Sequence, residues 1–587
     1  FGSRGGSLEH GDLSRGALYS AGACAGEFKI HMSNALSAAD FGCFFDSDSG
    51  SDCERDSIRM EQGVLSESVE FRLISGKRVH LSPNVVGSVS DVTGLLAKSL
   101  GLVPERIVLL SNEGIRVPLE LSASELDGVL QVLVLPDPLE KMLALACGVA
   151  TFDDLLEETV VDINEAAGLP ESLGRLALLM DLRVCHSGLT SLPESIGELQ
   201  ELETLWLASN RLESLPGSLC NLRKLQYLQL GDNLLTALPE SVGGLEGLVQ
   251  LELGRNRLAA LPDAICQLRF LARLGLTSNQ LASLPQGLGQ LQRLTHLRLD
   301  RNRLRDLPDD LVGLSALEVL TVSDNALKAL PRNLPELARL RSLEAKNNLL
   351  FFLPEDFGSM HSLNHLRLCG NQLSALPSGF GGLTSLRSLG LGGNRLVTLP
   401  ATFGRLEALQ LLSLNCNCLV ELPESFSDLA ALHTLGLDKN QLLKLPGGLG
   451  RLRALQSIGL EDNWLTVLPE GITELASLET LALGRNHLPG LPEGLGRLRA
   501  LQRLLLDGNP LRRLPRDLGA MASLRQVRLT GCPRLPLLTA GVWRLAGLAL
   551  LERAELDPPL RQQLSAWRCV RRAAARCACP RRAAAHA

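Results

Sequence analysis

Residues 202–224 read LETLWLASNRLESLPGSLCNLRK, and this 23-residue pattern decides the fold. Its asparagine, Asn210, recurs every 23 residues in fourteen consecutive units without an insertion. The same phase continues backward to Ser187 and Asn164 and forward to Cys532. A fixed period of this length indicates one structural unit stacked many times along the chain.

The first half of the unit predicts a short strand. Leu205 and Leu207 alternate with Trp206, so the two leucines face the core and the tryptophan faces the other way. Asn210 ends the strand, and its amide can both donate to and accept from backbone groups where the chain turns inward. Stacked units therefore predict an asparagine ladder, in which Asn325 in the middle should be buried with its amide satisfied.

The second half of the unit predicts a turn onto the opposite side of the sheet. Pro216 fixes φ and removes a donor, so it directs the chain away from the strand. Leu219, Leu222 and Leu225 follow at a spacing of three, which suits a short 3₁₀ or helical turn. One unit has too few apolar side chains to offset the entropy of ordering it, so neighbours must share a core in a quasi-one-dimensional solenoid.

The repeat resembles the leucine-rich repeat. Residues 192–212, LPESIGELQELETLWLASNRL, are similar to the intracellular Ras-group class, and the resemblance covers roughly residues 162–551. It implies an α/β leucine-rich-repeat solenoid of about 16–17 repeats that binds proteins. The Ras-group class also implies a small GTPase, a phosphatase or another signalling protein as the partner.

Residues 68–136 predict a second, smaller domain before the repeats. From Val69 the sequence VEFRLISGKRVHLS has two alternating runs around Ser75 and Gly76, which indicates a hairpin. A helical pattern at 90–100 and strand patterns at 106–111 and 129–135 follow. This order resembles the ubiquitin-like β-grasp domain, with an unrelated small α+β domain as the alternative. No Gly-Gly tail follows, so conjugation to other proteins is not expected.

The remaining segments have distinct compositions. Residues 1–66 are rich in Gly, Ser and Asp and are predicted to be disordered. Residues 137–161 predict a helical linker and cap, with the helix over 138–148. Residues 552–587 predict a C-terminal cap and a basic tail.

Composition excludes several classes of function. The 587 residues carry a net charge of −6, so no chain-wide basic field favours nucleic acid or an anionic membrane. No apolar run approaches the roughly 18 residues of a membrane span. The fourteen cysteines form no paired framework, and no Asn-x-Ser/Thr site occurs. We therefore expect a monomeric solenoid in the cytoplasm, with the nucleus as the alternative.

Catalytic motifs are incomplete. Residues 40–42 and 356–358 match the Asp-Phe-Gly triplet of kinases, but the glycine-rich loop, the lysine strand and the His-Arg-Asp loop do not occur. Phe357 also stands at a repeat position that is otherwise Leu or Ile and buried. His361 and His365 lack the glutamate of a zinc protease. We therefore expect no enzyme activity, no cofactor and no metal.

The open face of the sheet is the candidate binding site. Counted back from each ladder asparagine, positions −6, −4, −2 and −1 should point away from the core. In the units ending at Asn256 to Asn371 they hold mixed charges with a basic excess, whereas the unit ending at Asn394 holds serine and glycines. Trp206 and Tyr227 should be neighbours there, as is typical of an interface hot spot. The candidate partner-binding residues are Trp206, Tyr227, Gln229, Gln250, Glu252, Arg255, Arg273, His296, Arg298, Asp300, Arg301, Glu344, Lys346, His365 and Arg367.

These observations favour a non-catalytic protein-interaction scaffold in intracellular signal transduction, with a folded protein partner on the concave face. An ordinary solvated sheet face, or cover of the aromatic residues by another part of the chain, is the structural alternative. The functional alternatives are a substrate adaptor whose β-grasp domain binds a ubiquitin-system component, and the non-catalytic part of a larger enzyme.

Overall fold

The computed structural model describes residues 137–164, 166 and 168–535. It also describes strand residues 55–57, 69–72, 78–81, 107–110, 131–134 and 555–556, and single residues 93 and 562. The chain divides into two compact units, Phe1–Val134 and Leu135–Ala587.

The first unit contains two antiparallel strand pairs at predicted places. β2 (Val69–Arg72) pairs with β3 (Arg78–Leu81), as expected for the predicted hairpin. β4 (Ile107–Leu110) pairs with β5 (Gln131–Val134), and these strands fall within the two later strand patterns.

A further strand, β1 (Arg55–Ser57), pairs antiparallel with β5, although it lies within the 1–66 segment that was predicted to be disordered. The predicted helix at 90–100 lies almost wholly outside the described residues, as does the C-terminal tail. The β-grasp assignment therefore stays a prediction.

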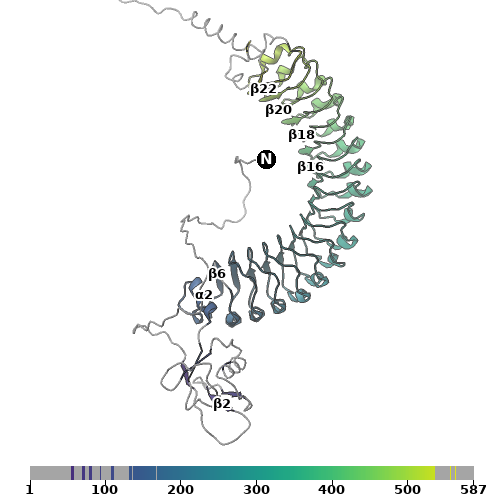
Figure 1. Ribbon diagram of the computed structural model, residues 1–587. Coiled ribbons are helices and arrows are strands. Elements are labelled where there is room, and N and C mark those ends of the chain that lie inside the picture. Colours follow the sequence, from purple (N-terminus) through teal and green to yellow (C-terminus); the bar gives the residue numbers. More distant parts are fainter. Residues whose placement is uncertain are drawn as a thin grey trace, which may run out of the picture. The chain divides into compact units, whose positions relative to one another are not determined.

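The second unit is a solenoid, as the repeat predicted. Its strands pair in parallel and in chain order, and Figure 1 shows them on the inner side of an arc with the 3₁₀ turns on the outer side. The seventeen regular strands and one short last strand are β6 (Val160–Asn164), β7 (Asp181–Cys185), β8 (Thr204–Trp206), β9 (Tyr227–Gln229), β10 (Gln250–Glu252), β11 (Arg273–Gly275), β12 (His296–Arg298), β13 (Val319–Thr321), β14 (Ser342–Glu344), β15 (His365–Arg367), β16 (Ser388–Gly390), β17 (Leu411–Ser413), β18 (Thr434–Gly436), β19 (Ser457–Gly459), β20 (Thr480–Ala482), β21 (Arg503–Leu505), β22 (Gln526–Leu529) and β23 (Glu555–Leu556).

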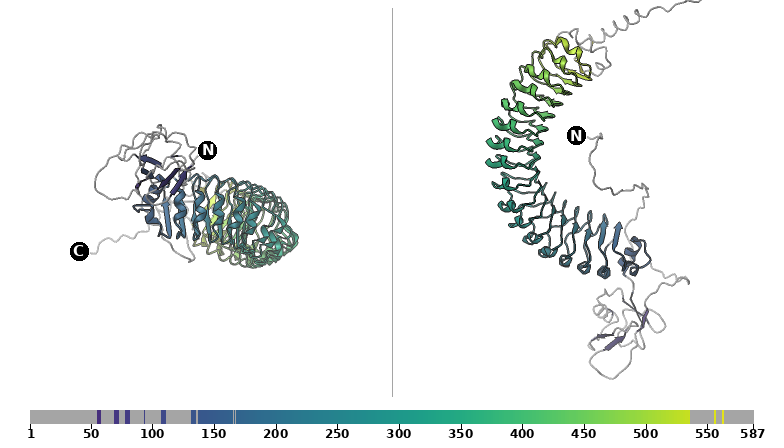
Figure 2. Two further views of the ribbon diagram at one scale, coloured as in Figure 1. Left: turned by 90° about the horizontal axis from the view of Figure 1, so that it is seen from below. Right: turned by 180° about the vertical axis from the view of Figure 1, so that it is seen from behind.

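A 3₁₀ helix follows most strands on the convex side, as the Leu spacing of three predicted. In most units a proline with φ near −65° precedes this turn, for example Pro216 before η6. Figure 2 shows the turns stacked along the outside of the arc. They are η3 (Asp153–Leu155), η4 (Glu171–Arg175), η5 (Glu194–Glu198), η6 (Gly217–Asn221), η7 (Glu240–Gly244), η8 (Asp263–Gln267), η9 (Leu288–Gln290), η10 (Asp309–Gly313), η11 (Leu334–Glu336), η12 (Glu355–Ser359), η13 (Ser378–Gly382), η14 (Ala401–Arg405), η15 (Glu424–Asp428), η16 (Gly447–Arg451), η17 (Glu470–Glu474), η18 (Leu495–Arg497) and η19 (Arg516–Ala520).

Helix α2 (Pro138–Ala146) directly precedes the repeats in the second unit, near its predicted place. Asp137 caps it by accepting a hydrogen bond from the Leu139 N–H at 2.9 Å, and Pro138 starts the first turn. Leu143 and Ala144 are buried on one helix face. Leu143 belongs to the same apolar core as the first repeats, so the helix covers the N-terminal end of the leucine rows.

The asparagine ladder is present. The Asn233 side chain donates to its own Leu230 carbonyl at 3.1 Å and to the Leu207 carbonyl of the preceding repeat at 2.9 Å. Its Oδ1 accepts from the Leu212 N–H of that preceding repeat at 3.0 Å. The two bonds to the preceding repeat recur at each of the fourteen phased asparagines, from Asn210 to Asn509.

The structure confirms the predicted ladder position of Cys532 and the predicted hydrogen bonding of Asn325, and it confirms the burial of Asn325 only in part. The Cys532 Sγ lies 3.4 Å from the Leu506 carbonyl, which is the place of the asparagine donor, so the forward extension is confirmed. The Asn325 amide is satisfied by the Leu304 N–H and the Leu299 carbonyl. Asn325 is only partly buried, however, whereas the other phased asparagines are buried.

The backward extension to Asn164 is wrong. β6 and β7 pair Asn164 with Cys185, an offset of 21 residues, whereas β7 and the regular strands after it pair at offsets of 23. Asn164 is therefore exposed at the end of β6, and Ala166 takes the buried ladder position. Among the described residues of the second unit, helix α2 and not a strand precedes this repeat, so they offer no earlier strand for an asparagine to bridge.

The residue before each ladder position adopts a left-handed backbone. Arg255 and Arg301 have φ values of 56° and 55°, and Gly370 and Gly393 occupy the same place in later repeats. The N–H of Arg255 donates to the Thr277 carbonyl of the next repeat at 2.7 Å. Non-glycine residues rarely adopt this conformation because it costs roughly 1–2 kcal/mol. The hydrogen bonds on both sides of the turn hold it in place.

A row of stacked phenylalanines runs through the convex side of the core. Phe357, Phe380, Phe403 and Phe426 are fully buried, with ring centroids 6.0–6.3 Å apart and nearly parallel planes. They occupy the position that holds Leu, Ile or Val in the other repeats. Since Phe357 belongs to this row, the Asp-Phe-Gly triplet at 356–358 is part of the repeat.

Removing a ladder amide should loosen the array locally. Asn325→Ala leaves the Leu304 N–H without its acceptor and removes one of the two amides that donate to the Leu299 carbonyl, which should cost about 1–3 kcal/mol. Hydrogen exchange should accelerate in the neighbouring repeats more than in distant ones. Asn221→Ala, at an exposed asparagine of η6, is the matched control. Exchange rates equal to those of the wild type across the array would contradict the ladder.

The phenylalanine row should carry substantial stability. Phe403→Ala removes a ring that stacks on both Phe380 and Phe426, and should lower the free energy of unfolding by about 3–5 kcal/mol. Phe270→Ala, at an exposed ring beside Arg293, should cost less than about 1 kcal/mol. Urea unfolding of both variants makes the comparison, and equal losses would show that the row is not a stabilising element.

Candidate protein-binding site

Strand alternation places the predicted site residues on the open face. In β10, Leu251 is buried in the core while Gln250 and Glu252 on either side remain accessible. The same pattern holds for the other predicted residues, so none of the fifteen lies in the core. The strand residues are Trp206, Tyr227, Gln229, Gln250, Glu252, Arg273, His296, Arg298, Glu344, His365 and Arg367, and those just after strands are Arg255, Asp300, Arg301 and Lys346.

The two aromatic residues lie on adjacent strands, as expected. Trp206 pairs with Gln229 in the β8–β9 ladder, and Tyr227 is two residues before Gln229 on β9. Trp206 is 42% exposed and Tyr227 is 43% exposed. The Arg183 guanidinium lies 5.1 Å from the centre of the Trp206 ring and is itself held by Asp181 at 2.5 Å. A fixed cation on one side restricts the indole and leaves the rest of its surface open.

Two strands beyond Tyr227, Gly275 on β11 creates a gap in the row of side chains. It pairs with Glu252 on one strand and Arg298 on the other. A Cβ at Gly275 would collide with Oε2 of Glu252, so the carboxylate leans over the glycine. This burial raises the pKa of Glu252, while Arg298 and Arg273 act in the opposite direction. The carboxylate thus lies in the field of two arginines.

His296 is part of the same cluster. It pairs with Arg273 across the β11–β12 ladder and lies two residues before Arg298. Burial lowers the pKa of His296, and the two arginines lower it further. Both effects favour the neutral form of the imidazole.

Ion pairing separates the basic residues of the site into two kinds. Arg255, Arg301, Lys346 and Arg367 each have a carboxylate within 2.8–3.8 Å. Among the described residues, no carboxylate lies within ion-pair distance of Arg273 or Arg298, and both are exposed. Within the predicted site, the positive charge without an ion pair is therefore concentrated on β11 and β12.

The charged patch ends where the sequence predicted. β16 contributes Ser388 and Gly390, and Gly392 and Gly393 follow it. This unit offers only small groups to a partner. The three units from Asn256 to Asn302 therefore form the basic part of the face.

A second charged cluster farther along the array was not predicted. Arg485 lies 2.5 Å from Asp462, 3.0 Å from Glu461 and 3.3 Å from Asp507, and these carboxylates raise its pKa. The four residues come from three repeats, so only a comparison of positions −1 and −2 across units would have found them. Because the charges are paired with one another, the cluster offers less free charge than Arg273 and Arg298.

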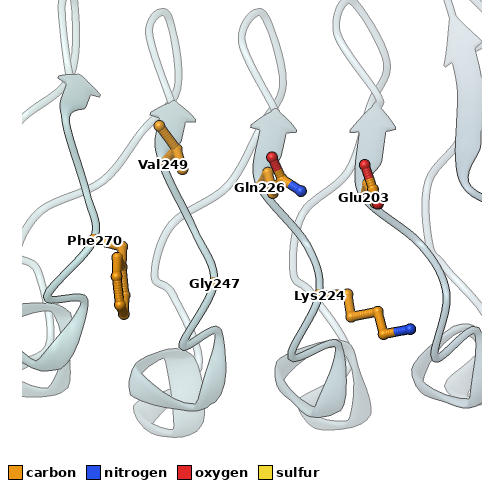
Figure 3. A pocket seen from close by; sticks show the side chains of 6 residues that line it. All are labelled: Glu203, Lys224, Gln226, Gly247, Val249 and Phe270. Atoms are coloured by element: carbon orange, nitrogen blue, oxygen red, sulfur yellow. The ribbon is translucent and has the colours of Figure 1, made fainter.

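A hollow of about 420 Å³ lies at the lateral edge where the chain enters the strands, and Figure 3 shows the side chains that line it. Gly247 lines the hollow without a side chain. A larger residue would not fit there, because its Cβ would lie 2.5 Å from the Arg223 carbonyl oxygen. This hollow was not identified from the sequence, although the exposed Phe270 could have indicated it. The Arg293 guanidinium carbon lies 4.5 Å from the centre of the Phe270 ring. The hollow is lined by Glu203, Lys224, Gln226, Gly247, Val249 and Phe270.

Two kinds of feature are absent from the described part of the chain. No group of three or more His, Cys, Asp or Glu residues is placed there to hold a metal ion. No helix among these residues has the length and apolar character needed to cross a membrane.

Sequence families match most of the array. The family described as leucine-rich repeat region matches residues 164–253 and 217–301. The family described as leucine rich repeat matches residues 292–350, 338–396, 398–442 and 453–511. A comparison with curated protein sequences gives no match.

Three solved structures illustrate the similarity. The LRR ectodomain of the plant membrane receptor kinase GASSHO1/SCHENGEN3 from Arabidopsis thaliana, solved with Casparian strip integrity factor 2, is 28% identical with a TM-score of 0.51. That match covers 65% of this chain and 51% of the receptor chain. The plant peptide hormone receptor RGFR1, solved with RGF2, is 24% identical with a TM-score of 0.50, covers 68% of this chain and 79% of that chain, and supports the fold alone.

A bacterial protein is more similar in sequence. An LRR protein of Leptospira interrogans is 33% identical with a TM-score of 0.56, and the match covers 61% of this chain and 92% of that chain. With the repeat families matching from residue 164 to residue 511, this chain belongs to the leucine-rich-repeat family.

Proposed function

We propose that the chain is a non-catalytic scaffold that binds a folded protein on the concave face of its repeats. The observation that carries the proposal is the pair of exposed, unpaired arginines, Arg273 and Arg298, near the exposed Trp206 and Tyr227. Four strand intervals separate β8 from β12, which is about 19 Å. One partner of ordinary size, whose interface buries roughly 800 Å² per side, can contact both groups together.

The proposed partner has an acidic surface. Free guanidinium groups pair with carboxylates and speed encounter with an acidic protein, while the aromatic pair supplies desolvated contact area. The similarity of the repeat to the Ras-group class favours a small GTPase or a phosphatase. The plant receptor kinase ectodomain, a structural relative, was solved in complex with Casparian strip integrity factor 2, which is consistent with binding by the repeats.

The proposed setting is intracellular signal transduction in the cytoplasm or nucleus. Seven of the described cysteines have free thiols, namely Cys147, Cys185, Cys220, Cys266, Cys369, Cys416 and Cys418, and Cys416 is exposed. Free thiols are typical of a reducing compartment, whereas secreted proteins tend to pair them.

For residues 68–136 we propose an autonomous β-grasp domain, on the strength of the antiparallel pairs β2–β3 and β4–β5. A separate domain before the array could recruit a second protein while the repeats hold the first. A ubiquitin-system component is the alternative partner for this domain.

Charge reversal and aromatic truncation should affect partner binding differently. Arg273→Glu with Arg298→Glu should slow association at least about tenfold at low salt and weaken its salt dependence. Trp206→Ala should mainly speed dissociation, because it removes desolvated contact area. Surface plasmon resonance against the partner recovered by affinity capture on the full chain measures both rates.

Thr434→Glu is the control, because it adds a negative charge at the exposed −6 position of β18, beyond the basic patch. Gly392, in the unit without charges, is a less suitable position for this control, since a Cβ there would lie 3.3 Å from the Asn415 carbonyl oxygen. If Thr434→Glu abolished binding and the arginine reversal had no effect, the site would lie on the later repeats instead. If every variant bound normally, the concave face would not be the interface.

The domain proposal has its own test. A fragment of residues 68–136 should give dispersed amide NMR signals and melt cooperatively, because an autonomous domain has its own core. An undispersed spectrum would rule out the assignment without affecting the proposal for the repeats.

A further inference from the structure

One lateral edge of the array exposes an unusual number of apolar side chains. This edge is formed by positions +1, +3 and +4 after each ladder asparagine, where the chain passes from the strand to the convex side. Over the six repeats from Asn348 to Asn463, seven large apolar residues there are 40–61% exposed. This lateral stripe consists of Leu349, Phe351, Phe352, Val397, Leu443, Trp464 and Val467.

The stripe is continuous at its centre and bounded at both ends. The Val420 N–H donates to the Val397 carbonyl at 3.4 Å, and the Leu443 N–H donates to the Val420 carbonyl at 3.2 Å, so these residues are adjacent. Position +3 is charged on both sides of the stripe, at Lys328 before it and at Arg512 after it. A bounded apolar patch of this kind marks an interaction surface.

We propose that the lateral stripe is the interface of a homodimer, in which it packs against the same stripe of a second copy. If each of the seven side chains exposes on the order of 100 Å², the stripe offers about 700 Å² per copy. A stable interface buries roughly 800 Å² on each partner, so the stripe and its polar rim are large enough. The dimer replaces the monomer that the sequence suggested.

The geometry of an arc favours a two-fold axis through the middle of the stripe, between the repeats of Val397 and Val420. This axis runs along a radius of the arc, from its centre through the middle of the stripe. A rotation of 180° about it turns the second copy so that its repeats run in the opposite order, while both arcs keep the same centre and curvature. The two edges therefore meet along their whole length. The repeat of Asn348 then faces that of Asn463, and each position faces its own counterpart.

This pairing matches apolar groups and complementary sizes. Val397 of one copy faces Val420 of the other, and the large Leu443 faces the small Ser374. At the ends, Phe352 faces Val467, and Leu349 faces Trp464 by the same rule.

The charged groups within the stripe also fit the two-fold arrangement. Arg395 faces Cys418, Lys444 faces Ala375 and Glu421 faces Thr398. No two like charges oppose each other across these six repeats, and a self-complementary surface is what a two-fold interface requires.

The dimer would present two concave faces in the same direction. A radial axis keeps the inner side of both arcs inward, so the stripe and the concave site do not compete. Two identical sites held together raise the avidity for a clustered or dimeric partner.

Sedimentation of the full chain tests the proposal. The wild type should be dimeric in the micromolar range. Val397→Lys and Val420→Glu should each raise the dimer dissociation constant at least about tenfold, because each places a charge opposite a valine. An equimolar mixture of the two variants should recover a dimer, because the introduced lysine of one chain then meets the introduced glutamate of the other, while the two unchanged valines remain paired.

Ala282→Lys, at the exposed +3 position of an earlier repeat, is the matched control and should leave the dimer intact. Unchanged thermal melting of the three variants would show that they fold. A wild-type chain that stays monomeric would overturn the proposal and leave the stripe to a different protein. Dimers in both single variants, or no recovery in the mixture, would overturn the two-fold pairing.

Discussion

Each repeat of this protein is joined to the preceding one through the amide of a single asparagine. That side chain closes the turn of its own strand and satisfies a donor and an acceptor of the previous repeat, as Asn233 does with Leu212 and Leu207. The Leu212 N–H is buried and donates to the asparagine Oδ1, so leaving this donor unpaired would be costly, and the Leu207 carbonyl accepts from both Asn233 and the Asn210 amide of its own repeat. Their satisfaction fixes the spacing at 23 residues from β7 onward, and the leucine rows and the stacked phenylalanines follow from that register.

The same register creates the surfaces available for binding. Since every strand starts at the same point of its unit, side chains four and six residues before the asparagine form rows across the inner sheet. Exchanging one residue then changes the surface locally without disturbing the core. Gly275 is an example, because its missing side chain lets Glu252 lean toward Arg298 while Leu274 stays buried. Residues of the lateral edge also vary from repeat to repeat without disturbing the core, with valine or leucine on some repeats and lysine or arginine on others.

Much of this was accessible from the sequence. The period identified the solenoid, the strand positions, the ladder and the residues of the open face, because strict spacing and strand alternation determine all four. The exception at Asn164 arose at the end of the array, where no earlier repeat enforces the phase. The left-handed residue before each asparagine went unnoticed, because Ser, Asp, Arg and Lys share that position with Gly. The sequence also did not predict which charged residues form ion pairs, since this depends on how side chains such as Arg485 reach across three repeats.

The proposed partner-binding site is the concave face between Trp206 and Arg367. Hydroxyl-radical footprinting of the full chain, with and without the captured partner, tests it most directly, because aromatic and histidine side chains are oxidised in proportion to their exposure. The account predicts that Trp206 and Tyr227 are protected by the partner, while Trp464 on the lateral edge is oxidised equally with and without it. Protection of Trp464 with no change at Trp206 and Tyr227 would contradict the account.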